Sequence, residues 1–319
     1  MFRVLGYMIH TPVLLKEVIR YLNPRPNENF IDATFGGGGH ALEILKRIAP
    51  KGKLLGLDWD PTSLGLSAKL RRASSAEGFK LETRSENLAE SEPLIRSGIE
   101  LGPFSKTRND ADGTRNYPST SLGAGADDSG LIVECANFAE IENISREYFP
   151  EGVNGVLFDF GLRTGQLEGD EKGEKGKMNR RGFSYLKNEP LDMRFNMDQP
   201  LTASEIINTW PERELEIIFK DYGEEKNARK IAKAIVEARK QSKIETTGEL
   251  VEIIGGRDIK TLARIFQALR IAVNNELENI RLGLEGAWRM LKPGGLASPS
   301  PSQGGPASPS PSQGGPASP

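Results

Sequence analysis

The chain has 319 residues, of which 37% are hydrophobic and 27% charged, with a formal net charge of -2. This length allows one large or two modest domains, and the composition is that of a soluble globular protein. No apolar run approaches membrane-spanning length, and the charge is not that of a dedicated nucleic-acid binder. The single Cys135 excludes internal disulfides and fits the cytoplasm, and with only His10 and His40 beside it a zinc site is disfavoured.

A helix is predicted first, from Thr11 and Pro12 to Leu22, because Thr-Pro is typical of an N-cap and a first helical position. An apolar strand then ends near Ile31. Glycines follow it from Gly36 to Gly39, where the backbone can adopt a positive φ and approach a ligand closely.

The pattern after these glycines predicts a nucleotide-cofactor site. Apolar residues recur at helical spacing from Ala41 to Ile48, and a second buried strand over 54–57 is closed by Asp58. Asp58 follows Gly39 by about the 20 residues expected for a carboxylate that binds ribose hydroxyls in a doubly wound fold. A glycine cluster alone indicates only a turn, so the inference depends on its combination with Asp58.

The spacing of the glycines and an acid before them indicate which cofactor binds. A dinucleotide fingerprint needs G-x-G-x-x-G facing a pyrophosphate, whereas here Asp32 stands four residues before Gly36 and would repel phosphate. An acid at this point suits a ligand with a sulfonium or ammonium group, which favours S-adenosylmethionine (SAM) over NAD. The alternative is that Asp32 only caps the turn.

Residues 69–130 are dominated by Ser, Gly, Asp, Asn and Arg, and we expect a disordered insertion there. Strand character resumes at 131–133, and a further strand over 153–158 is followed by Asp159. Open α/β sheets bind ligands at the carboxyl ends of their strands. We therefore expect one cleft to be lined by Asp32, Asp58, Phe138 and Asp159.

A helical pattern follows from about Leu167 to Arg257 and predicts a helical insert. Apolar residues spaced from Ile265 to Leu284 then predict one long helix that returns to the sheet and is ended by Lys292-Pro-Gly-Gly.

Several motifs occur in an order that closely resembles the RsmH (MraW) family. They are HTPVLL from His10, IDATFGGGGH, LLGLDWDP, Asn137-Phe-Ala, GVLFDFG at 155–161, RGFSY at 181–185, PLDMR at 190–194, YGEEKNARKIAKAI at 222–235 and RIFQALRIAVNNELE at 264–278. Members of this family are bacterial SAM-dependent methyltransferases that act on the N4 amine of a cytidine in 16S ribosomal RNA of the small subunit. The resemblance thus implies a SAM cofactor, an RNA partner, no membrane and a cytoplasmic location, and it is compatible with a homodimer.

The resemblance also implies the fold. We expect an α/β, Rossmann-like class I SAM-dependent methyltransferase sheet, with its later strands missing, and an inserted helical substrate-binding domain. The expected division is a methyltransferase domain over 1–68, 131–166 and 258–295, a disordered insertion over 69–130, the helical insert over 167–257, and a disordered tail over 296–319.

Carried over to this sequence, the family's cofactor site falls on the turn and the strand ends. Gly38, Gly39 and His40 would line SAM beside Gly36. Asp58 would bind its ribose and Phe138 would pack near its adenine. Asp32, Asp159 and Gln166 would complete the site. Asp159 is also the candidate acceptor for the amine proton, because methyl transfer to an exocyclic amine requires alignment of its lone pair and loss of a proton.

Candidate RNA contacts come from basic residues near the site and on one helix. The family has two serines where this chain has Arg163 and Thr164, and Arg163 can contact a phosphate. The other candidates are Arg181 in a charged, glycine-broken loop and Arg229, Lys230 and Lys233 on a helix. A charged helix face is usually only solvated, which is the alternative for the last three.

The end of the chain departs from the family. The family continues with a fifth strand and Ser-Phe-His-Ser-Leu-Glu-Asp, whereas here ASPSPSQGGP at 297–306 is repeated at 307–316. We expect no strand from this repeat, which leaves the strand over 153–158 as an open edge. The repeat is interpreted as a frameshift or read-through product, with a ligand for proline-recognising domains as the alternative.

Three functions are compatible with these observations. The first is the ribosomal RNA cytosine-N4 methyltransferase, with activity impaired by truncation. The second is a non-catalytic remnant that binds SAM or RNA. The third is an NAD-type oxidoreductase, which Asp32 and the glycine spacing disfavour.

Overall fold

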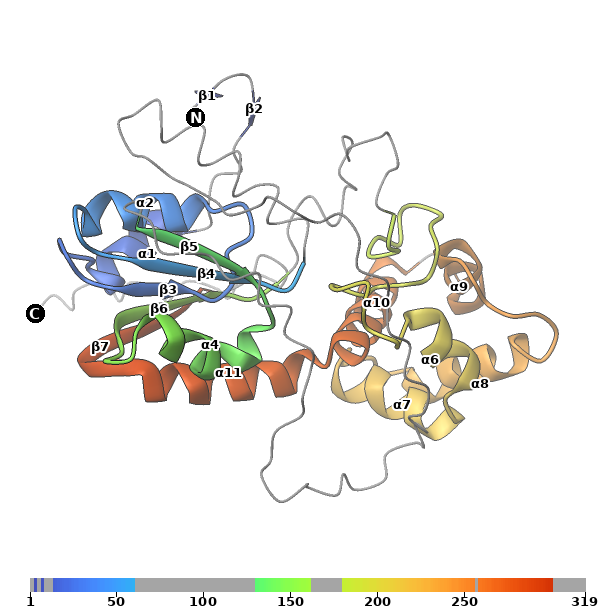
Figure 1. Cartoon of the computed structure of the whole chain (residues 1–319). Helices are drawn as coiled ribbons and strands as arrows, with labels where there is room; N and C mark the ends of the chain where they lie inside the picture. The colour runs from blue at the N-terminus through green and yellow to red at the C-terminus, as the bar shows by residue number, and fades with distance from the viewer. Residues whose placement is uncertain are drawn as a thin grey trace, which may run out of the picture.

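The computed structural model describes residues 3–4, 7–8, 14–60, 130–161, 180–255 and 258–300. They form a sheet covered by helices and, beside it, a unit built mainly of helices (Figure 1). The two units are joined where helix α10 (Ile259–Asn274) passes into helix α11 (Glu276–Met290).

The sheet has five parallel strands in the order β5-β4-β3-β6-β7. In chain order these are β3 (Phe30–Asp32), β4 (Leu54–Asp58), β5 (Leu131–Cys135), β6 (Val153–Asp159) and β7 (Leu291–Ser300). A separate antiparallel pair is made by β1 (Arg3–Val4) and β2 (Tyr7–Met8). The doubly wound α/β sheet expected from the sequence is therefore present.

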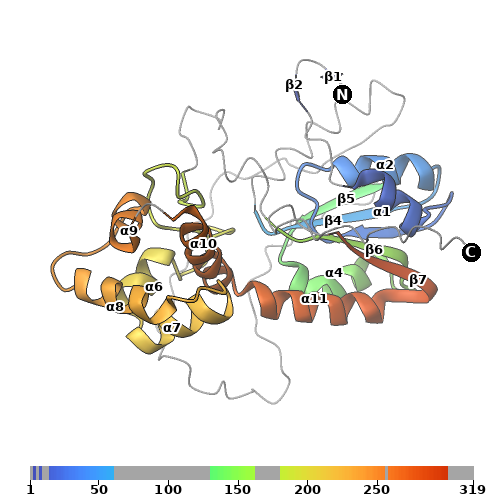
Figure 2. The ribbon, with the colours of Figure 1, turned by 180° about the vertical axis from the view of Figure 1, so that it is seen from behind.

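Alternation along the strands divides the core between the two faces of the sheet, as successive side chains point to opposite sides. One cluster contains Phe30, Leu54, Leu131 and Leu157, and the other contains Ile31, Leu55, Ile132 and Val156. The first lies under α1 (Leu15–Leu22) and α2 (Gly39–Ile48). The second lies under α4 (Ile141–Tyr148) and α11. Both views show these helix pairs on opposite faces (Figures 1 and 2).

The helical unit has its own apolar core. This core contains residues of α6 (Ala203–Thr209), α7 (Glu212–Asp221), α8 (Ala228–Ala238), α9 (Thr247–Ile254) and α10, together with residues of the segment before α6. Thr246 and Glu249 form a capping box that fixes the start of α9. Because Ile265 and Leu269 of α10 belong to this core, the unit extends past residue 257, where the predicted insert ends. None of the helices in the described ranges combines the length and apolarity needed to cross a bilayer.

The prediction of one long helix between Ile265 and Leu284 is wrong. Asn275 has φ 48° and ψ 41°, and it ends α10 and begins α11. Asparagine adopts this left-handed conformation more readily than most residues. The chain therefore changes direction at Asn275, although the apolar spacing continues on both sides of it.

The prediction that no strand forms from the repeat is also wrong. β7 runs to Ser300 and pairs with β6, from Gly155 with Leu296 to Asp159 with Ser300. β6 therefore lies between β3 and β7 and is not an open edge. Outside the described residues lie the Thr11-Pro12 helix start, the predicted insertion up to residue 129, Arg163, Gln166 and the tail after Ser300.

Candidate cofactor site

Three aspartates end three neighbouring strands at the same edge of the sheet. Asp32 ends the central β3, Asp58 ends β4 and Asp159 ends β6. Asp32 is in register with Gly56 and Leu157, so Asp58 and Asp159 both stand two residues beyond it. Parallel strands present their carboxyl ends together, and the convergence expected from the sequence is observed for these three residues.

The glycine turn after β3 folds back over Asp58. The backbone N–H of Gly36 donates a hydrogen bond of 2.8 Å to Asp58 Oδ2. Gly36 and Gly38 have φ values of 51° and 71°, a region that favours glycine. A Cβ built on Gly37 would meet nothing within 4 Å. The turn is thus closely approachable, as a bound ligand requires.

Asp58 is held in a fixed orientation. Besides the bond from Gly36, its Oδ1 accepts a 2.9 Å bond from the backbone N–H of Asp60. Two backbone donors, one on each oxygen, restrict the orientation of the carboxylate. A carboxylate in such a fixed orientation can accept hydrogen bonds from a pair of vicinal hydroxyls.

Asp32 is buried and its ionised form is disfavoured. Asp32 is 1% exposed, and its Oδ1 accepts a 3.2 Å hydrogen bond from the backbone N–H of Thr34. Burial raises the pKa of Asp32 to about 7, and the charges of Asp159 and Asp58 add to this effect. The turn cap considered as an alternative is therefore present. It is compatible with a cofactor role, because a cationic ligand would favour the ionised form.

Thr34 connects the turn to β6. The backbone N–H of Asp159 donates a 2.6 Å hydrogen bond to Thr34 Oγ1. This links the end of the central strand β3 to the end of its neighbour β6. The charge of Asp159 contributes to the raised pKa of Asp32, so the two carboxyl groups interact at this edge.

An aromatic cluster stands next to this edge. The ring of Phe138, in the short helix η1 (Phe138–Glu140), packs against Phe158 and Phe160 with centroid distances of 6.1 and 5.6 Å. A Cβ on Gly283 of α11 would approach Phe138 Cδ2 to 2.8 Å, so the ring fits closely against that helix. Phe138 remains half-buried and thus partly accessible.

The other predicted residues of the first loop lie at the start of α2. Gly38 is the N-cap, Gly39 is the first helical residue, and His40 follows and is 7% exposed. No acidic residue occurs in the first turn of this helix. The positive end of the helix dipole therefore faces the glycine turn, and no acidic side chain in the first turn of α2 offsets it.

Arg181 does not lie at a surface loop, so the prediction that it contacts RNA is corrected. It is 6% exposed, and its Nη2 forms a 2.6 Å ion pair with Oδ2 of Asp60, which is 2% exposed. Asp60 was not among the residues predicted for the site. The signal that could have found it is the second acid of LLGLDWDP, two residues after Asp58.

The predicted RNA-binding helix is α8. Its buried face carries Ala228, Ile231, Ala232 and Ile235, and Arg229, Lys230 and Lys233 are exposed on the rest of its surface. This position allows contact with a large polyanion. It does not bring these side chains to the three aspartates, which belong to the other unit.

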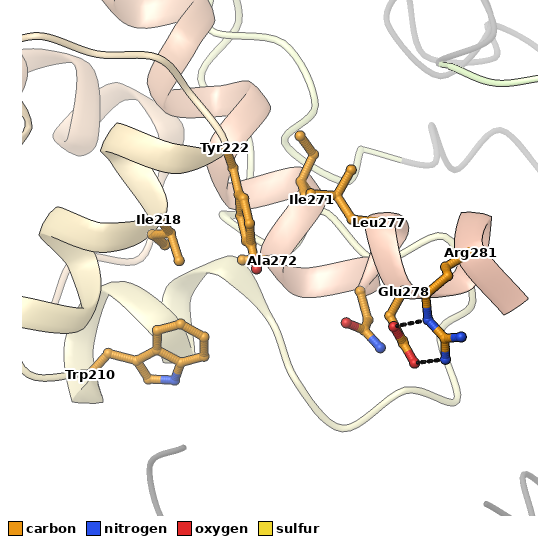
Figure 3. Close-up of a pocket in the computed structure, with 9 residues that line it drawn as sticks. Trp210, Ile218, Tyr222, Ile271, Ala272, Leu277, Glu278 and Arg281 are labelled. Carbon is orange, nitrogen blue, oxygen red and sulfur yellow. Dashed lines mark hydrogen bonds and ion pairs between the residues drawn. The ribbon is translucent and has the colours of Figure 1, made fainter. Parts of the chain in front are cut away.

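A cavity of about 390 Å³ lies away from this edge, at the junction of α10 and α11 (Figure 3). Trp210, Tyr222 and Leu277 contribute to its lining, and at one side Glu278 and Arg281 form an ion pair of 2.7 Å. None of the residues predicted to bind the cofactor lines it. The ion pair neutralises the charge that Arg281 could offer to a phosphate.

The sequence of this chain is similar to a known protein family. A model of the MraW methylase family matches residues 7–91 and 117–298. The unmatched residues between them fall inside the predicted insertion. The match also includes most of β7, up to Ser298.

Three relatives carry the name ribosomal RNA small subunit methyltransferase H. The chain is 38% identical to the protein of Symbiobacterium thermophilum, 37% to that of Geobacter sulfurreducens and 35% to that of Heliobacterium modesticaldum. Each match covers 90% of this chain and 73%, 75% and 74% of the respective relative. A crystal structure of TrmN from Thermus thermophilus matches 47% of this chain and 28% of that chain, at 17% identity and a TM-score of 0.26, too distantly to inform fold or function. The family match on both sides of the unmatched stretch, together with relatives of this identity and coverage, shows that the chain belongs to the MraW methylase family.

Proposed function

We propose that this protein transfers a methyl group from SAM to the N4 amine of a cytidine in 16S ribosomal RNA of the small subunit. The observation that carries the proposal is the edge at which Asp32, Asp58 and the glycine turn meet, in a chain of the MraW methylase family. The names of the three relatives support the choice of ribosomal RNA as substrate. Family membership removes the NAD-type oxidoreductase from consideration.

SAM would lie along the turn, with its ribose on Asp58 and its adenine near Phe138. Gly38, Gly39 and His40 would line it from the start of α2, and Gln166 is proposed as a further contact on the basis of the family alone. Asp32 offers a carboxylate to the positive charge of the ligand. The donor supplies an electrophilic methyl carbon on a sulfonium.

In the reaction, the N4 lone pair forms a bond to the methyl carbon while the carbon–sulfur bond breaks. The sulfur takes the bonding electrons and becomes a neutral thioether. The amine then carries an extra proton, which must leave for the product to be neutral. We propose the carboxylate of Asp159 as the acceptor, because it ends the strand adjacent to Asp32.

The helical unit is proposed as the part that binds RNA, through the exposed side chains of Arg229, Lys230 and Lys233 on α8. Arg163 is proposed as a phosphate contact closer to the site. The cytidine must be presented unpaired for its amine to reach the methyl group. The cytoplasm as the location, a homodimer as the assembly and the domain division over the sequence remain predictions.

The test uses a strain that lacks the family's methylation of 16S ribosomal RNA. Expression of this chain should restore N4-methylcytidine, measured by mass spectrometry of nuclease digests, and Asp58→Ala should abolish the restoration. A soluble wild-type chain that binds SAM by calorimetry but restores no methylation would contradict the proposal. That result would favour the non-catalytic SAM-binding remnant.

A further inference from the structure

A buried ion pair connects the cofactor edge to the helical unit. Asp60 follows β4, Arg181 belongs to the segment that leads into the helical unit, and their charged groups meet at 2.6 Å. The side chains are 2% and 7% exposed. Removing two charges from water costs free energy that their attraction largely offsets, so a pair of this kind is weak as a source of stability. A role in fixing position is the better account of it.

On the sheet side, the pair is one hydrogen bond away from the proposed ribose carboxylate. The N–H of Asp60 donates to Asp58 Oδ1, and Asp58 Oδ2 accepts from Gly36. The backbone of Asp60 therefore helps to orient Asp58, while the side chain of Asp60 points to the other unit. One residue thus serves both the cofactor edge and the contact between units.

On the helical side, Arg181 binds the turn that follows it. Its Nη1 donates to the carbonyl oxygens of Arg194 and Phe195 at 3.1 and 2.8 Å. The guanidinium lies 5.6 Å from the ring centroid of Phe183, and that ring stacks on Phe195. Apart from Asp60, these partners of Arg181 all belong to this one segment.

The same turn is fixed to the junction between α10 and α11. Asn274, the last residue of α10, is fully buried; its Oδ1 accepts from the N–H of Phe195 and its Nδ2 donates to the carbonyl of Met193. The carbonyl of Asn274 accepts from Asn279 of α11. Contacts thus run without interruption from the glycine turn to the point where the chain passes between the units.

Among the described helices and strands, the two units meet mainly where α10 continues into α11. A single connection at Asn275 would leave rotation about that point. A second attachment, at Asp60 and Arg181, removes this rotation. We propose that Arg181 is a positioning residue for methyl transfer, which holds the RNA-binding unit at a fixed angle to the cofactor edge through Asp60. The effect on methyl transfer rests on the proposed function, whereas the fixed angle between the two units does not.

The kinetic test compares Arg181→Met with a matched control, Arg194→Met. Arg194 also binds one aspartate, Asp192, and two carbonyl oxygens, but all of these lie within its own segment. Arg181→Met should lower kcat for RNA methylation by tenfold or more, because a small displacement of reacting groups has an effect of this size, and change the Kd of SAM less than threefold. Arg194→Met should lower kcat less than threefold. Equal losses of kcat in the two variants would overturn the inference.

If Arg181→Met does not yield soluble protein, Asp60→Asn decides in its place. It keeps the shape of the side chain and the backbone bond to Asp58 and removes only the charge. The same loss of kcat is expected, and an unchanged kcat would overturn the inference. Arg181→Lys, which keeps the charge, should recover part of the rate lost in Arg181→Met.

A distance measurement separates this inference from the proposed function. Spin labels are placed on the exposed Tyr21 in α1 and Lys240 just after α8, in a Cys135→Ser background, and read by double electron–electron resonance. Arg181→Met should broaden the distance distribution, and Arg194→Met should leave it as in the wild type. An unchanged distribution in Arg181→Met would overturn the inference even if the wild type methylates RNA. A broadened distribution in a chain that is inactive on RNA would contradict only the proposed function.

Discussion

Asp32 is a carboxyl group in a place where its charged form is disfavoured. Its pKa in the folded chain is about 7, whereas the ordinary value is 3.8, mainly because of burial. Between these two pH values the folded state binds more protons than the unfolded state. The stabilising contribution is therefore complete below pH 3.8 and is lost as the pH rises through about 7.

We predict that Asp32→Asn removes this pH dependence. In the ligand-free wild type, the free energy of unfolding should fall between pH 4 and pH 7, by up to roughly 4 kcal/mol from this residue. The variant should lack that fall and be more stable than the wild type at pH 8. Urea unfolding of both proteins across this range is the measurement, and parallel curves would contradict the prediction.

SAM binding should depend on pH through the same residue. A sulfonium favours the ionised carboxylate, so SAM should bind with release of a proton below pH 7. Its affinity is expected to fall by up to about tenfold for each pH unit below 7. S-adenosylhomocysteine has a neutral sulfur, and its affinity should change less.

Calorimetry in two buffers of different ionisation enthalpy counts the released protons. Asp32→Asn is the control, because SAM should bind to it more weakly and without the proton. If the two ligands show the same pH dependence in the wild type, the pairing of Asp32 with the sulfonium is wrong.

The position of the aspartates at one edge of the sheet could be predicted from the sequence, whereas the buried position of Arg181 could not. Each aspartate follows an apolar strand, and the geometry of parallel strands brings such residues to one edge. Arg181 stands next to Arg180, after a lysine-rich and glycine-rich stretch, which resembles a solvated loop. Its partner Asp60 is 121 residues away, and no local pattern specifies a pair over that distance.

At the scale of elements, the division of α10 from α11 depends on one residue. The apolar spacing is helical on both sides of Asn275, so periodicity alone predicts continuity. The left-handed conformation at φ 48° is what changes the direction. The period of apolar residues does not show that a single residue adopts a left-handed conformation.

We predict that Asn275→Gly and Asn275→Ala have different effects. Glycine adopts a positive φ without strain, so Asn275→Gly should change the free energy of unfolding little. Alanine should lose about 1 kcal/mol, because its Cβ is strained in this conformation. Equilibrium denaturation of the two variants provides the comparison. Equal stability would mean that the junction relaxes to another conformation.

β7 was not predicted because few of its residues are typical of a β-strand. The strand includes Pro293, Gly294 and small residues, which are depleted in strands. It forms next to β6, whose Val156, Leu157 and Phe158 are fully buried and whose backbone groups need partners. The strand is thus determined by its neighbour more than by its own residues.

At the scale of the whole molecule, the sheet and the helical unit each have a separate core, and the reaction needs both. The sheet supplies the cofactor edge, and its last strand is the one made partly from the repeat. Asp159 is in register with Ser300, so the end of β7 supports the strand that carries the proposed proton acceptor. Stability of the sheet and function of the site are therefore coupled at residues 296–300.

Two shortened chains test this coupling. A chain ending at Ser300 keeps every residue of β7, whereas one ending at Gly295 loses the residues paired with Gly155 to Asp159. Hydrogen bonds contribute about 0.5–1.5 kcal/mol each, so the shorter chain should lose roughly 2–4 kcal/mol relative to the longer one. It should also bind SAM more weakly, because β6 becomes an open apolar edge beside Asp32 and is prone to pair with other chains. Thermal unfolding, SAM titration and light scattering of the two proteins measure these effects. If both chains are equally stable and bind SAM equally well, β7 contributes nothing to the sheet beyond Gly295, and the repeat-derived residues have no part in holding Asp159.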